Sequence, residues 1–190
     1  MSTTDLRSLH QLSKVELLPT RSSELSATLS FLEKIDHIEI NGTTERNGVV
    51  YYRVEVFLQH SMSRIPTVKA TAVADHPDYQ LERRFSDFAN LRYQVWMYAQ
   101  RKHEDDQSCE YCGEFMSYIV HSLSQPRSLV KLVTGVNARK KLLVAFCNTF
   151  IEKTIAGKTD LQMRNSKCTG LQTIPHIVED FFRPASEIRT

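Results

Sequence analysis

Two neighbouring arginines, Arg83 and Arg84, stand directly before the aromatic residue Phe85. A guanidinium group is a rigid, planar fork of N–H donors that can hold phosphate oxygens in pairs, which lysine does less well. A second basic run, Arg139 to Lys141, begins a predicted helix, where cations oppose the helix dipole and so suggest a nearby anion. Both runs are candidates for a phosphate-binding site. The alternative is that the basic side chains are solvated charges and that Phe85 packs in the core.

The composition limits the possible partners. With 190 residues, 41% of them hydrophobic, the chain fits one ordinary globular domain and a short tail. The 24 Lys and Arg residues against 22 Asp and Glu give a formal net charge of +2, so extensive nucleic-acid binding is excluded and any anion site must be local. The sequence contains no apolar run of about 18 residues and no secretory signal, so we expect a soluble, cytoplasmic protein with free thiols.

The strands that must position the first arginine pair are expected upstream of it. The alternating segment Ile35–Ile40 and the β-branched and aromatic run Val49–Leu58 predict a hairpin, with a connection from Asn41 to Gly48 that is longer than a tight turn. A third strand is expected over Tyr79–Phe85, and Val68–Val73 suggests a further short strand. Residues 1–30 are expected to form a flexible N-terminal arm.

Helical spacing follows the third strand. Ser86 is the expected N-cap of a helix whose apolar residues recur every three or four positions. A short helix is expected over Glu114–Leu123, and Asn137 is expected to cap the longest helix. Thr173 and Pro175 are expected to open the last one. Strands followed by helices predict an α+β fold.

This order of elements resembles the PX (phox-homology) domain of the sorting-nexin type, a phosphoinositide-binding module, from about Ile35 to Phe182. The sequence RRFSDF, Arg83 to Phe88, matches the family pattern Arg-[Arg/Lys]-[Tyr/Phe]-x-Asp-Phe. The sequence ARKKLLVAF is similar to Arg-x-x-x-Leu-x-x-Phe, with Arg139 at the motif arginine. The resemblance implies a three-stranded antiparallel sheet packed against a helical subdomain over residues 31–184, with an insertion around 101–123 and a tail over 185–190.

The resemblance also implies the ligands of the headgroup. In PX domains the second arginine of the pair binds the 3-phosphate and the next aromatic ring lies under the inositol, which correspond here to Arg84 and Phe85. Arg139 would hydrogen-bond the 4- and 5-hydroxyls, which favours phosphatidylinositol 3-phosphate as the lipid. On a regular strand Arg84 and Phe85 would point to opposite faces, so the strand must end or twist there.

A loop that follows Pro126 departs from the family pattern. PX domains use a basic residue of a proline-rich loop for the 1-phosphate, and here either Arg127 or Lys131 fits, with Arg127 preferred because it directly follows the proline. Four aliphatic residues of the same loop stand where PX domains insert into the bilayer, and each would contribute about 1.5 kcal/mol or more if fully buried. They are Leu129, Val130, Leu132 and Val133. Packing inside the domain is the alternative for all four.

The cysteine pair Cys109 and Cys112 has the spacing of half a zinc site, and His103 and His121 flank it. No second pair of this spacing exists in the chain, so a structural zinc site, a redox pair and two incidental thiols are the alternatives, of which the last is preferred. The sequence interpretation therefore assigns no metal and no cofactor. Cys147 is expected on the apolar face of its helix.

The sequence interpretation as a whole is a phosphoinositide-binding module that attaches peripherally to endosomal or similar membranes. Its partners are the lipid headgroup and the membrane surface, not nucleic acid. No nucleophile–base pair stands at motif spacing, and the 6 glycines form no phosphate loop, so no enzyme is expected. The alternative is a protein-interaction module that has the PX fold and binds lipid weakly or not at all.

Overall fold

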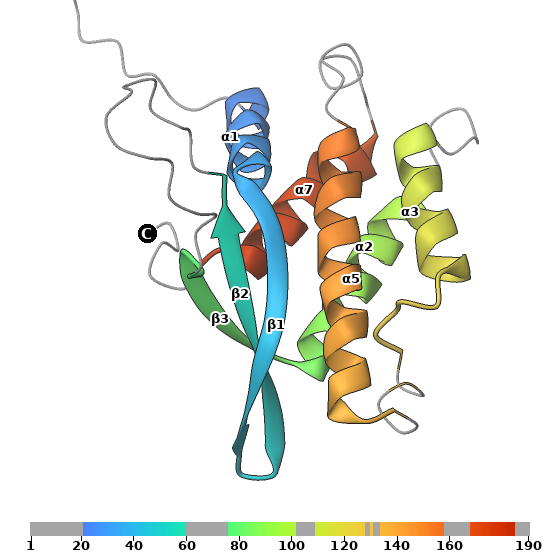
Figure 1. Ribbon diagram of the computed structural model, residues 1–190. Helices are drawn as coiled ribbons and strands as arrows, with labels where there is room; N and C mark the ends of the chain where they lie inside the picture. The colour runs from blue at the N-terminus through green and yellow to red at the C-terminus, as the bar shows by residue number, and fades with distance from the viewer. Residues whose placement is uncertain are drawn as a thin grey trace, which may run out of the picture.

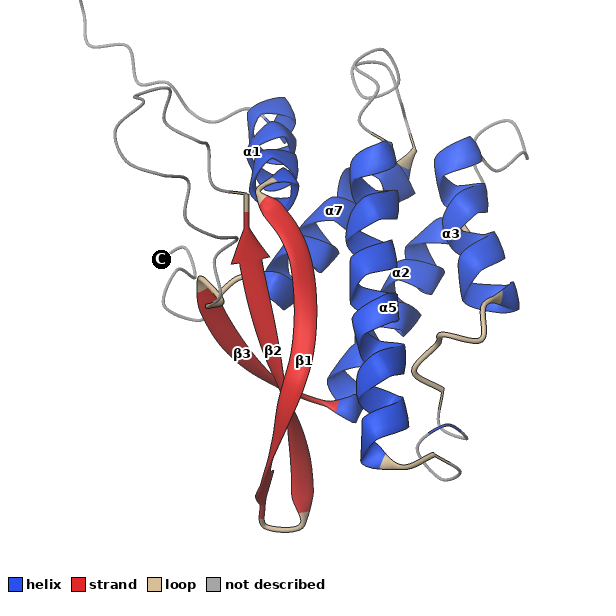
Figure 2. Cartoon of the chain, in the orientation of Figure 1, coloured by secondary structure: helices blue, strands red, loops and turns tan. Residues whose placement is uncertain are grey.

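A computed structural model of the chain describes residues 21–59, 76–101, 109–127, 130, 134–157 and 168–184. A three-stranded antiparallel sheet lies on one side and a group of helices on the other (Figures 1 and 2). The elements run in the order α1 (Arg21–Glu33), β1 (Ile35–Arg46), β2 (Val49–Leu58), β3 (Tyr79–Arg84), α2 (Phe85–Ala99), α3 (Glu110–His121), α5 (Val136–Ala156) and α7 (Thr169–Phe182). The expected α+β fold class, with an antiparallel sheet packed against helices, is confirmed.

The hairpin of β1 and β2 has a tighter turn than the sequence suggested. β1 continues through Gly42 to Arg46, and the turn consists of Asn47 and Gly48, whose φ angles are +52° and +73°. Two successive positive φ angles are what a type I′ hairpin turn requires, and Asn-Gly is its preferred sequence. The expected connection from Asn41 to Gly48 was wrong because Gly42 lies at a shift of the pairing register inside the strand.

The first helix replaces part of the expected N-terminal arm. Residues 21–30 belong to α1, which packs against α7, and residues 1–20 lie outside the described part of the chain. Leu25, Leu29 and Leu32 are buried along one side of α1. The Thr28 hydroxyl donates a 2.6 Å hydrogen bond to the Glu179 carboxylate on α7. The folded domain therefore begins about ten residues before the expected boundary.

Two helices start earlier than expected. α3 begins at Glu110 rather than Glu114, and its residues Phe115 and Ile119 are fully buried, so the expected insertion contributes a helix to the common core. α7 begins at Thr169 because Cys168 is its N-cap, and Pro175 lies inside the helix instead of opening it. Proline there removes one helical N–H donor, and the Pro175 ring is buried.

The N-caps of α2 and α5 also differ from those expected. α2 begins at Phe85 with Arg84 as its N-cap, two residues before the expected N-cap Ser86. The N-cap of α5 is Gly135 rather than Asn137. The possible strand Val68–Val73 and the tail 185–190 lie outside the described residues.

The helix α5 is fastened to β1, an edge strand of the sheet. The Asn148 side chain accepts a 2.9 Å hydrogen bond from the Ile38 N–H and donates a 3.0 Å hydrogen bond to the Ile38 carbonyl. Asn148 thereby pairs both backbone groups that β1 turns away from β2 at this residue. One turn from the start of the helix, Lys140 Nζ donates to the Asn41 carbonyl at 2.9 Å. These contacts set the position of the first turn of α5 relative to the sheet.

Replacing Asn148 with Ala should lower the free energy of unfolding by about 1–3 kcal/mol, because the Ile38 N–H and carbonyl both lose their partner. Urea denaturation measures this change. Asn137→Ala is the control, since Asn137 is exposed on the same helix and its loss should change stability by no more than about 0.5 kcal/mol. Equal denaturation midpoints for the two variants would contradict the role given to Asn148.

Candidate phosphate-binding site

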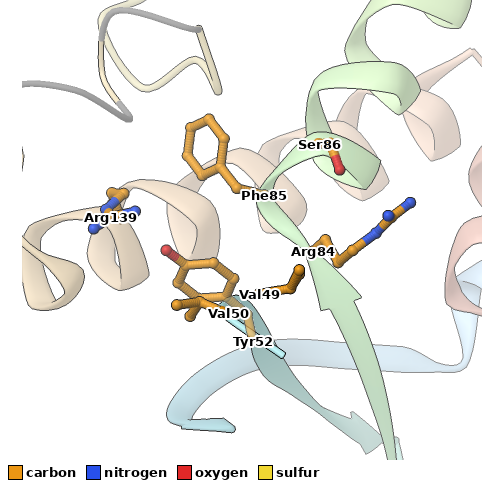
Figure 3. A pocket seen from close by; sticks show the side chains of 8 residues that line it. Val49, Val50, Tyr52, Arg84, Phe85, Ser86 and Arg139 are labelled. Carbon is orange, nitrogen blue, oxygen red and sulfur yellow. The ribbon is translucent and has the colours of Figure 1, made fainter. Parts of the chain in front are cut away.

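A pocket of about 270 Å³ lies where the hairpin, the end of β3 and the start of α5 meet (Figure 3). This volume is slightly below the range of about 300–1,000 Å³ that is typical of small-molecule sites. The hairpin and β2 supply the first part of its lining, the β3–α2 junction supplies the second, and α5 supplies Arg139. The lining residues are Gly48, Val49, Val50, Tyr52, Arg84, Phe85, Ser86 and Arg139. Three of the sequence-predicted site residues, Arg84, Phe85 and Arg139, therefore line one pocket.

The junction of β3 and α2 explains how two adjacent residues reach the same pocket. The ladder between β2 and β3 ends at the pair Tyr51 and Arg84. Arg84 keeps an extended backbone, with φ −80° and ψ 159°, while Phe85 is the first helical residue. The change in backbone direction at this point removes the alternation that would send the two side chains to opposite faces.

Arg84 is half-exposed, and its guanidinium pairs with Asp87. Arg84 Nη2 lies 3.1 Å from Asp87 Oδ1, and this pairing raises the pKa of Arg84. The backbone N–H of Arg84 donates to the other oxygen of the same carboxylate at 2.7 Å. In Figure 3 the Arg84 side chain extends away from Arg139. The rim position of Arg84 leaves it free to rotate, but in this conformation the two guanidinium groups do not face each other.

Arg83 has a different environment from its neighbour. Its Nε and Nη2 donate to the Phe181 carbonyl at 3.3 and 2.8 Å, at the end of α7, and its guanidinium lies 5.2 Å from the centre of the Phe181 ring. Burial lowers the pKa of Arg83, an effect that the charge of Asp87 opposes. Arg83 therefore holds α7 to β3, whereas Arg84 is available at the pocket.

Arg139 and Tyr52 form the more enclosed part of the pocket. The Tyr52 hydroxyl points toward Arg139 (Figure 3). Arg139 Nε is buried and has no hydrogen-bond partner among the described residues. Tyr52 is fully buried, and its hydroxyl interacts with the Arg139 side chain. Burial raises the pKa of the Tyr52 phenol, and the positive charge of Arg139 opposes this rise. Buried donors without partners are rare, so this corner is suited to a ligand that brings acceptor oxygens.

Two aromatic rings border the pocket, and only one was expected from the sequence. Phe85 is 5% exposed and belongs to the hydrophobic core, so it presents only a small part of its ring to the cavity. Tyr52 was not singled out, although Val50, Tyr52 and Val54 alternate along β2 and so share one face of the sheet. That alternation, together with a hydroxyl on an otherwise apolar face, is the signal that could have identified it.

Of the residues predicted to bind or insert from the loop after Pro126, the structure describes only Arg127 and Val130, and neither lines the pocket. Arg127 Nη2 donates to the carbonyls of Ile119 and Val120, at 3.2 and 2.9 Å, in the last turn of α3. Arg127 is not among the residues that line the pocket. Val130 is half-buried against the core. The other candidates, Leu129, Lys131, Leu132 and Val133, lie outside the described residues.

A cluster of three cysteines lies elsewhere in the fold. Cys109, Cys112 and Cys168 place their sulfur atoms within 4.8 Å of one another, so these residues could hold a metal ion. The sequence interpretation considered only the first two. His121 is at the opposite end of α3, roughly 18 Å along the helix axis from Cys109, and cannot join them. His103 lies outside the described residues.

Comparison of the chain with protein-family models, with curated proteins and with solved structures finds no match. The PX resemblance therefore remains a prediction, based on the two sequence motifs.

The different environments of Arg83 and Arg84 lead to different effects on stability. Arg83→Ala should lower the free energy of unfolding by about 1.5–3 kcal/mol, because a charged donor to the Phe181 carbonyl is lost. Arg84→Ala should leave the denaturation midpoint nearly unchanged, because Arg84 is on the surface. Guanidinium denaturation of both variants measures the contrast, and a larger loss in Arg84→Ala would contradict the roles assigned here.

Proposed function

We propose that this chain is a phosphoinositide-binding module that attaches reversibly to membranes, and that phosphatidylinositol 3-phosphate on endosomal-type membranes is its preferred lipid. The observation that carries the proposal is that Arg84 and Arg139, which are far apart in the sequence, line one pocket together with Phe85. Guanidinium groups from separate elements are suited to an anion that fills the space between them. The proposal includes no catalytic activity and no nucleic-acid partner.

The two arginines have different tasks in this proposal. Arg139 Nε lacks a partner among the described residues, so a hydroxyl oxygen of an inositol ring would satisfy it. Arg84 would turn from Asp87 toward the 3-phosphate, which carries a charge of about −1.5 to −2 and three acceptor oxygens. A phosphate can compete with Asp87 because the existing ion pair is on the surface and is screened by water and salt.

Attachment to the membrane would be peripheral. None of the described helices combines the length and hydrophobicity needed to cross a bilayer. Val49 lines the pocket and is 38% exposed, so an apolar side chain is available beside the proposed headgroup site. Leu129, Leu132 and Val133 remain the proposed insertion residues, and Val130 would contribute less because it packs against the core.

A second function is favoured by one specific observation. Arg84 and Arg127 already have partners within the protein, namely Asp87 and the carbonyls at the end of α3. Internal partners would weaken a phosphate site, as expected for a protein-interaction module that binds lipid weakly or not at all. Lipid-binding measurements distinguish the two functions.

Replacing Arg84 or Arg139 with Ala should reduce binding to liposomes that contain phosphatidylinositol 3-phosphate by about tenfold or more, because each variant loses a charge-assisted contact. Liposome co-sedimentation measures binding, with phosphatidylinositol liposomes as the lipid control. Lys141→Ala is the matched protein control, since it removes an exposed charge from the same turn of α5 and should change binding much less. Wild-type binding by both arginine variants would exclude this pocket, and wild type that did not bind would favour the protein-interaction module.

The pocket and the insertion segment should act on different parts of the lipid. Leu132→Ser combined with Val133→Ser should weaken binding to liposomes but leave affinity for a soluble, short-chain phosphatidylinositol 3-phosphate almost unchanged, because aliphatic side chains contact only hydrocarbon. Arg84→Ala should weaken both. Titration calorimetry with the soluble lipid measures the difference. Loss of thermal stability together with loss of soluble-lipid binding in the serine variant would instead place these residues in the core.

A further inference from the structure

Three cysteine sulfurs meet between the starts of two helices. Cys168 Sγ lies 3.5 Å from Cys109 Sγ and 3.5 Å from Cys112 Sγ, and all three sulfurs are within 4.8 Å of one another. Cys112 and Cys168 are buried and Cys109 is half-buried. The segments that carry them are more than 50 residues apart in the sequence, so the fold brings them together.

The spacing of the sulfurs is that of a metal site rather than of a disulfide. A disulfide bond is about 2.05 Å long, and none of the three sulfurs is joined to another by one. Sulfur ligands lie about 2.3 Å from zinc, so two sulfurs of a tetrahedral site are about 3.8 Å apart. The 3.5 Å distances come close to this value. A single disulfide would also leave one of the three thiols unused, whereas one metal ion can bind all three.

Backbone groups around the sulfurs favour the thiolate form that a metal requires. Cys109 is the N-cap of α3 and Cys168 is the N-cap of α7, so both sulfurs lie at the positive end of a helix dipole. The Leu171 N–H donates to Cys168 Sγ at 3.2 Å, whereas the Cys109 sulfur accepts no cap hydrogen bond. Such N–H donors orient metal ligands and stabilise their charge.

The packing around Cys112 keeps space for its sulfur. A Cβ atom at Gly170 would lie 2.5 Å from Cys112 Sγ, so any side chain at that position would displace the sulfur. A divalent cation bound at this place would neutralise the thiolates.

We propose that Cys109, Cys112 and Cys168 bind one zinc ion, which fastens the start of α3 to the start of α7. Three thiolates select a borderline-soft metal such as zinc over magnesium or calcium, which prefer oxygen ligands. The fourth position of the tetrahedron is left for a water molecule or another donor. The thiol protons pass to the solvent on binding, so affinity falls as the pH is lowered.

The proposed site has a structural role and is separate from the phosphate-binding pocket. The first turns of α3 and α7 lie at one end of the helical layer, and the first turn of α5, which carries Arg139, lies at the other (Figure 1). No described residue belongs to both sites. The metal would therefore hold helices in place without touching the lipid.

Metal content tests the proposal. The full chain, purified under reducing conditions and incubated with zinc, should retain about one zinc ion per chain after desalting. Cobalt added in its place should give the intense visible bands of a tetrahedral thiolate site. Cys109→Ser and Cys168→Ser should lose most of the zinc and these bands, while serine preserves the N-cap of each helix. Cys147→Ala is the matched control, a buried cysteine on α5 that should keep both.

Several results would overturn the proposal. They are a wild-type chain that retains no zinc, cobalt spectra without thiolate bands, full zinc content in Cys109→Ser, or loss of zinc from Cys147→Ala as complete as from Cys109→Ser. A disulfide between Cys109 and Cys112 in the protein as purified, shown by thiol counting, would also overturn it. If a serine variant failed to fold, the cobalt spectrum of the wild-type chain would still decide, because it reports the ligand atoms directly.

Discussion

The end of β3 at Arg84 is the constraint on which the candidate site depends. The carboxylate of Asp87 accepts the Arg84 N–H and so satisfies the backbone group at the point where the strand becomes a helix. The same residue therefore ends the ladder with Tyr51 and caps α2. If the strand continued by one residue, the side chains of Arg84 and Phe85 would point to opposite faces of the sheet.

The side of the pocket that carries Arg139 depends on side-chain contacts between α5 and β1. α5 carries Arg139 in its first turn, and Asn148 and Lys140 hold this helix to the edge of β1. The contacts pair backbone groups that the sheet would otherwise leave open. The pocket is thus formed by polar contacts at the ends and edges of the sheet, and the aromatic core holds the two layers together.

The sequence predicted the parts of this structure that depend on local pattern. Alternation and helical spacing indicated the α+β class, and the run Arg83 to Phe85 with Arg139 indicated residues that the fold does bring to one pocket. The family motif assigned the ligand to Arg84 and not to Arg83, but local pattern could not predict the role of Arg83, because that role depends on the Phe181 carbonyl nearly 100 residues away. Cys168 was missed for the same reason, since its neighbours Cys109 and Cys112 are close only in the folded chain. The position of the hairpin turn was missed because Asn41-Gly42 and Asn47-Gly48 have the same local signal, and pairing with β2 decides between them.

The central claim is that Arg84 and Arg139 bind one phosphorylated headgroup. The most direct measurement is NMR of the arginine Nε–H groups during titration with a soluble, short-chain phosphatidylinositol 3-phosphate. The Arg84 and Arg139 signals should shift along a common saturation curve, with little change at Arg83, whose guanidinium is held by the Phe181 carbonyl. No saturable shift at either arginine, or equal shifts with short-chain phosphatidylinositol that lacks the 3-phosphate, would contradict the claim.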